Sequence, residues 1–179
     1  CVTGQHRKML DQALSLFGIQ ADYDLMVMKK NQDLFYITTK IISEFKDVLL
    51  KEKPDLTVVH GDTTTTMAAS LASFYLKIPI AHVEAGLRTN DLYSPFPEEL
   101  NRSLVSKIAK YHFAPTKEAK LNLVSENIPS KDIFVTGNTV IDSLFLIVKK
   151  SRKIKFTNAL IKKMPFLNKV KINKNIILV

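Results

Sequence analysis

The spacing of apolar residues along this chain changes repeatedly between two patterns, which predict helices and strands in turn. Residues 7–17 carry apolar side chains three and four positions apart, as in an amphipathic helix, and Gly18 follows where that helix would end. The short apolar run LTVVH at 56–60 instead predicts a buried strand. The same criteria predict further helices over 34–51, 64–76, 97–109, 117–126 and 138–148, and further strands over 79–83, 111–114 and 132–136.

Strands that alternate with helices favour an α/β fold with a parallel sheet and right-handed crossovers, of the doubly wound kind. The first residues, CVTGQHRKML, resemble the end of a strand that continues through a loop into a helix, so we expect the sequence to begin inside a domain. We predict one domain over 1–148, a basic linker with weak helical periodicity over 149–174, and the first strand of a second domain at 175–179 (NIILV).

The formal net charge of +9 is unevenly distributed. Residues 1–142 hold 16 basic and 17 acidic side chains, whereas 143–179 hold 10 basic side chains and no acidic one. The basic segment contains few aromatic residues for stacking on bases, and we therefore expect no nucleic-acid partner.

Cysteine content and hydropathy restrict the cellular compartment and the kinds of site that we expect for this protein. The single cysteine, Cys1, excludes a disulfide framework and a cysteine-based zinc site within this sequence. So low a cysteine content suggests a reducing compartment, and we therefore expect a cytoplasmic location. No apolar run approaches the ~20 residues that span a bilayer, so we expect no membrane partner.

Polar residues directly after the predicted strands are the first candidates for a site, because ligands of open α/β sheets bind beyond the carboxyl ends of the strands. His60 and Asp62 follow one strand, and His82 and Glu84 belong to the end of the next. These four residues could form a metal site, although their spacing is unspecific and both histidines could instead be packed in the core.

Several of these residues have a second, structural interpretation. Asp62 could cap the helix that begins at 64, and the threonine run after it could bind a phosphate at that helix N-terminus or simply form a polar first turn. Glu98 and Glu99 follow Pro97, where acidic side chains stabilise a helix start. Three arginines could contact phosphate, although each could equally be an ordinary surface residue: Arg7, Arg88 and Arg102.

Longer motifs resemble one enzyme family. They are TGQHRKMLDQ (3–12), HGDTTTTMAASLASFY (60–75), HVEAGLRT (82–89), LYSPFPEELNR (92–102), YHFAPT (111–116) and FVTGNTVIDSL (134–144). In this order they resemble the non-hydrolysing UDP-N-acetylglucosamine 2-epimerases across nearly all of residues 1–148.

The resemblance implies two Rossmann-like domains in the glycosyltransferase-B arrangement, with the substrate between them. This sequence would be most of the first domain, without its opening strand and phosphate loop. It implies a substrate pair of UDP-GlcNAc and UDP-ManNAc, no cofactor, a role in surface polysaccharide synthesis, and a homodimer for the full-length protein. The fragment alone would be inactive.

The resemblance also assigns roles to residues. The catalytic acids and bases of the family correspond to Asp62, Glu84 and Glu98. The expected substrate contacts are His6, Arg7, Thr63, Thr64, Arg88 and Arg102. Gln5 matches an allosteric site of bacterial relatives, but Lys8 and Asn31 stand where those relatives have Gln and Arg, which counts against that site.

Two rival functions stay open. A hydrolysing relative would release free ManNAc and UDP from the same intermediate, and a truncated chain could bind a sugar nucleotide without catalysis.

Overall fold

The computed structural model describes residues 1–4, 7–29 and 32–151. Its helices are α1 (Arg7–Phe17), α2 (Leu34–Glu52), α3 (Thr64–Tyr75), α4 (Glu98–Ile108), α5 (Lys117–Ser125) and α6 (Thr139–Ser151), with a 3₁₀ turn at Ser130–Asp132. Its strands are β1 (Thr57–His60), β2 (Ile80–Val83), β3 (Tyr111–Ala114) and β4 (Ile133–Val135). Every helix and strand predicted within these ranges is present, with ends that differ by a few residues.

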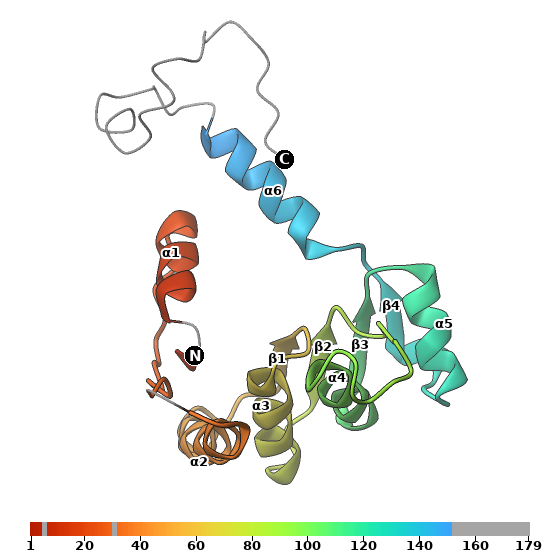
Figure 1. The fold of residues 1–179 in the computed structure, drawn as a ribbon, viewed down its shortest axis with the longest axis horizontal. Helices are drawn as coiled ribbons and strands as arrows, with labels where there is room; N and C mark the ends of the chain where they lie inside the picture. The colour runs from red at the N-terminus through yellow and green to blue at the C-terminus, as the bar shows by residue number, and fades with distance from the viewer. Residues whose placement is uncertain (5–6, 30–31, 152–179) are drawn as a thin grey trace, which may run out of the picture. The chain divides into compact units, whose positions relative to one another are not determined.

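The four strands form one parallel sheet in the order β1-β2-β3-β4 (Figure 1). A helix connects each strand to the next, which confirms the predicted α/β class. Because the strands are parallel, all four carboxyl ends lie along the same edge of the sheet.

The start of the chain is extended and pairs with a later segment. The amide of Val2 donates to Tyr23 O at 2.8 Å, and the amides of Leu25 and Val27 donate to Val2 O and Thr3 O at 2.9 and 2.8 Å. These contacts form an isolated parallel β-bridge between Val2 and Asp24, and α1 begins at Arg7.

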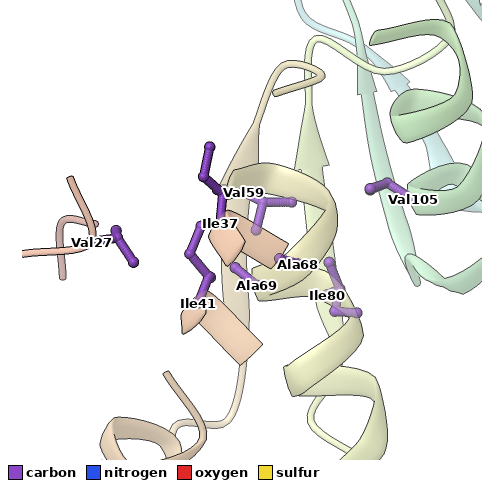
Figure 2. Close-up of a cluster of buried hydrophobic side chains, with 8 residues drawn as sticks. All are labelled: Val27, Ile37, Ile41, Val59, Ala68, Ala69, Ile80 and Val105. Atoms are coloured by element: carbon purple, nitrogen blue, oxygen red, sulfur yellow. The ribbon is translucent and has the colours of Figure 1, made fainter. Parts of the chain in front are cut away.

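The core lies between the sheet and the helices, with α3 against β1 and β2 and α2 packed on α3. Figure 2 shows its main cluster, in which side chains from α2 and α3 meet those of β1 and β2. The cluster consists of Val27, Ile37, Ile41, Val59, Ala68, Ala69, Ile80 and Val105. A second cluster joins α5 to β3 and β4 through Ala85, Ala114, Ala119, Leu123 and Ile133. The small side chains of the alanines allow the helix and sheet backbones to approach closely.

Two predictions about helix starts are corrected. The N-cap of α3 is Thr63, whose Oγ1 accepts the Thr66 amide at 3.4 Å, and not Asp62. Pro97 stands one residue before the first helical residue of α4. The side chain of Asp62 is therefore not used by the helix cap.

By its contacts the chain divides into two units, Cys1–Asn138 and Thr139–Val179. The described part of the second unit is α6, which contains the beginning of the predicted basic segment. The rest of that segment and the strand predicted at 175–179 lie outside the described residues.

Candidate functional site

The candidate site lies where β1 and β2 end. The amide of Gly61 donates to Val83 O at 3.0 Å, so the two strands stay paired up to the residues that carry the predicted carboxylates. Asp62 and Glu84 are about a third exposed, at 30% and 32% of their side chains. The fold thus places two solvent-accessible carboxylates on neighbouring strand ends, as the sequence predicts.

Glu84 has a left-handed backbone, with φ of +66°. Such a conformation costs a non-glycine residue about 1–2 kcal/mol and is concentrated at functional sites. Its Oε2 lies 3.5 Å from Nε2 of the exposed His60, and 3.6 Å from where a Cβ on Gly61 would lie. The local backbone therefore directs Glu84 toward the end of β1.

Arg102 holds Asp62 from α4. Its Nη1 lies 3.1 Å from Asp62 Oδ2, and the neighbouring Asn101 donates from Nδ2 to Asp62 O at 2.9 Å. The Arg102 side chain is only 9% exposed and also contacts Glu99. The family resemblance predicts Arg102 as a substrate contact, and the structure brings it to the predicted catalytic Asp62.

Glu98 and Glu99 differ although they are adjacent. Glu98 is half-buried on the first turn of α4, whereas Glu99 is 1% exposed. Burial alone would raise the pKa of Glu99, but hydrogen bonds from the Thr89 amide, Arg102 and the Asn90 amide outweigh it and lower that pKa below its ordinary value. From the sequence, Glu99 is expected only to stabilise the helix dipole. The sequence signal that could have indicated its ion pair is Arg102, three residues later on the same helix.

The other predicted substrate contacts are distributed around the fold. Thr63 lines a hollow of about 410 Å³ beside β1, and Thr64 is buried at 5% exposure. Arg88 is 3% exposed and forms an ion pair with Glu126, at 2.5 Å from Nε to Oε1. Arg7 pairs with Asp11 and Asp24 at the start of α1. His6 and Gln5 lie outside the described residues.

Beneath the site lies a buried histidine pair. His82 and His112 are direct neighbours in the sheet register and are 0% and 1% exposed. Nε2 of His82 is 2.7 Å from Gly61 O, and because a carbonyl only accepts hydrogen bonds, this nitrogen carries the proton. Burial lowers the pKa of His82 to about 4, so the ring is neutral at pH 7.

The metal alternative gains no support. Across residues 1–4, 7–29 and 32–151, no three His, Cys, Asp or Glu side chains are grouped so that they could hold a metal ion. His82 is directed to Gly61, and Asp62 to Arg102. None of the helices in these ranges combines the length and hydropathy that a membrane span needs.

Comparison with known proteins gives consistent matches. The family model described as UDP-N-acetylglucosamine 2-epimerase matches residues 1–179. A UDP-N-acetylglucosamine 2-epimerase of Neisseria meningitidis is 58% identical over 167 residues, which are 93% of this chain and 45% of that protein. The chain therefore spans about half the length of this relative.

Solved structures agree. The crystal structure of UDP-GlcNAc 2-epimerase from Neisseria meningitidis bound to UDP-GlcNAc has a TM-score of 0.87 and covers 93% of this chain and 45% of that one. The Methanocaldococcus jannaschii enzyme in complex with UDP-GlcNAc and UDP has a TM-score of 0.81 at 39% identity, covering 90% of this chain and 44% of that one. This likeness confirms the predicted Rossmann-like half of a glycosyltransferase-B-type fold.

Proposed function

Because the chain belongs to the UDP-N-acetylglucosamine 2-epimerase family, we propose that it supplies one half of an active site that interconverts UDP-GlcNAc and UDP-ManNAc. One observation carries the proposal most strongly. Asp62 and Glu84, two partly exposed carboxylates, stand at the carboxyl ends of adjacent parallel strands, where α/β folds bind their ligands.

The chemistry requires such groups. The carbon-2 proton of an N-acetyl sugar has no neighbouring carbonyl to acidify it, so direct removal is too slow. We propose that the anomeric carbon–oxygen bond breaks, UDP leaves with the bonding electrons, and a carboxylate removes the carbon-2 proton. This gives 2-acetamidoglucal and UDP. A proton then returns to the opposite face of carbon 2, and UDP adds again to carbon 1.

Inversion at carbon 2 needs proton transfer on both faces of the sugar, and therefore more than one acid or base group. We propose Asp62, Glu84 and Glu98 for these roles. In support, Glu84 is held toward the end of β1, and Asp62 is held by a cationic Arg102. His6, Arg7, Thr63, Thr64, Arg88 and Arg102 are the proposed substrate contacts, either directly or through the groups they pair with.

The finer assignments rest on the family resemblance. We propose the non-hydrolysing, isomerase type of reaction, a cytoplasmic role in surface polysaccharide synthesis, and a homodimer for the full-length protein. The 179-residue chain alone is expected to be inactive. Turnover of UDP-GlcNAc by the purified chain would contradict that expectation.

The test uses a chimera in which this chain replaces the matching residues of the Neisseria meningitidis protein. We expect UDP-GlcNAc epimerisation by the chimera, and a fall in kcat of at least about 100-fold on Asp62→Asn, Glu84→Gln or Glu98→Gln. Glu118→Gln, an exposed glutamate on the first turn of α5, is the matched control and should keep full activity. Wild-type turnover in any of the three variants would remove that residue from the site.

A further inference from the structure

Glu99 uses both of its carboxylate oxygens although it is almost fully buried. Oε1 accepts the Asn90 amide at 3.1 Å. Oε2 accepts the Thr89 amide at 3.1 Å and Arg102 Nε at 2.6 Å, and it lies 2.5 Å from Arg102 Nη2. A glutamate that served only the helix dipole would need none of these contacts, so Glu99 joins the loop after β2 to the guanidinium of Arg102.

The other end of the same guanidinium contacts Asp62. Nε and Nη2 are directed to Glu99, and Nη1 is 3.1 Å from Asp62 Oδ2. Because the guanidinium is planar and rigid, fixing two of its nitrogens on Glu99 also fixes the direction of the third. Arg102 is 9% exposed, so water cannot easily replace either partner.

We propose that Glu99 is a positioning residue: its buried carboxylate fixes the guanidinium of Arg102, which in turn fixes the carboxylate of Asp62. The catalytic use of this positioning rests on the function proposed above. The positioning of Asp62 by Glu99 through Arg102 does not depend on that function. The relay joins the loop after β2, the first turn of α4 and the second residue after β1, so it connects the segments that carry Asp62 and Glu98.

The relay is tested on the chain itself by NMR, with ¹³C and ¹⁵N labelling. In Glu99→Gln we expect the Arg102 Nε–H to exchange with water at least about tenfold faster, because a charge-assisted hydrogen bond is lost. We also expect the Asp62 ¹³Cγ resonance to move. Glu118→Gln, which changes an exposed glutamate on the first turn of α5, should leave both signals in place.

Either of two results with Glu99→Gln would overturn the proposal. One is Arg102 Nε–H exchange in Glu99→Gln that matches the wild type. The other is faster exchange with an unmoved Asp62 ¹³Cγ resonance, which would show that Glu99 does not position Asp62. If Glu99→Gln lacks a dispersed amide spectrum, Arg102→Lys replaces it. Lysine keeps the charge but lacks the planar fork, so Asp62 ¹³Cγ should move there, and an unmoved signal overturns the proposal.

Kinetics in the Neisseria chimera add a readout that a purely structural role would not change. We expect Glu99→Gln to lower kcat by about tenfold or more with an unchanged KM, because the reacting group is misplaced while substrate binding is retained. Glu118→Gln, which stands at the same position of its helix as Glu99 does in α4, should keep kcat. An unchanged kcat in Glu99→Gln would refute a catalytic use of the relay. A chimera that is inactive with Glu99 intact would refute the proposed function, and the NMR result would still decide the relay.

Discussion

At the scale of single residues, Gly86 shows how closely the loop after β2 packs against α5. A Cβ at this position would lie 2.2 Å from Ala119 O, and the φ of +92° also disfavours side chains. Asn122 Nδ2 donates to Gly86 O at 2.9 Å and holds the loop at this separation. The loop leads directly from Glu84 to Arg88, so this contact positions the site.

We therefore expect Gly86→Ala to lower the free energy of unfolding by at least about 3 kcal/mol, measured by urea denaturation. Gly18→Ala is the control, because Gly18 also has a positive φ, of +69°, but nothing lies within 4 Å of the point that a Cβ would occupy there. That variant should lose only about 1–2 kcal/mol. Equal losses would show that the close approach to Ala119 costs nothing.

The buried His82 makes stability depend on pH. A histidine in the unfolded chain has a pKa near 6.5, whereas the pKa of the folded His82 is about 4. Between these values the unfolded state binds more protons, so stability falls as the pH falls. The lowered pKa values of Glu99 and Glu126 change the stability mainly below pH 4.5, the ordinary pKa of glutamate. They therefore contribute little to the pH dependence that His82 causes.

We expect the free energy of unfolding to be about 2 kcal/mol lower at pH 5 than at pH 7.5 because of His82. His82→Gln can still donate to Gly61 O but does not titrate, and it should flatten this slope. Burial lowers the pKa of His112 as well, so part of the slope should remain. An identical slope in wild type and His82→Gln, followed by urea denaturation at several pH values, would contradict the assignment.

At the scale of elements, an ion pair joins the loop after β2 to the end of α5. Arg88 is 3% exposed and donates to Glu126 Oε1 and Oε2 at 2.5 and 3.1 Å, and to Ser106 Oγ at 2.8 Å. Burial would raise the pKa of Glu126, but Arg88 and Lys107 outweigh it and lower that pKa. The pair keeps a buried cation neutralised close to the candidate site.

Glu126→Gln leaves the guanidinium of Arg88 without a charged partner. We expect a loss of about 2–3 kcal/mol in the free energy of unfolding. Glu118→Gln, on the exposed first turn of the same helix, should change it by less than about 0.5 kcal/mol. Similar small effects of both changes would mean that Arg88 is solvated or paired elsewhere.

The order of helices and strands was predictable because each has its own apolar period and its own start and stop residues. The N-cap of α3 was not, since Asp62 and Thr63 are adjacent and both cap helices well. The structure decides in favour of Thr63, because Asp62 is paired with Arg102, 40 positions away in sequence.

At the scale of the whole molecule, the sequence located Asp62 and Glu84 because the ends of parallel strands converge whatever the details of packing. It could not locate the partners of Arg88 and Arg102. Those pairings join segments 38 and 40 positions apart and depend on how the helices pack on the sheet. The contacts of Glu99 and Arg102 are consequences of tertiary packing, whereas the placement of Asp62 and Glu84 at neighbouring strand ends follows from topology.

The most direct test of the proposed reaction is ¹H NMR of UDP-GlcNAc in D₂O with the chimera that carries this chain. Elimination and re-addition of UDP exchange the carbon-2 proton with solvent. We therefore predict UDP-ManNAc with deuterium at carbon 2, and loss of this activity in Asp62→Asn and Glu84→Gln. Free ManNAc and UDP as the only products, or an epimer that keeps its carbon-2 proton, would contradict the proposed reaction.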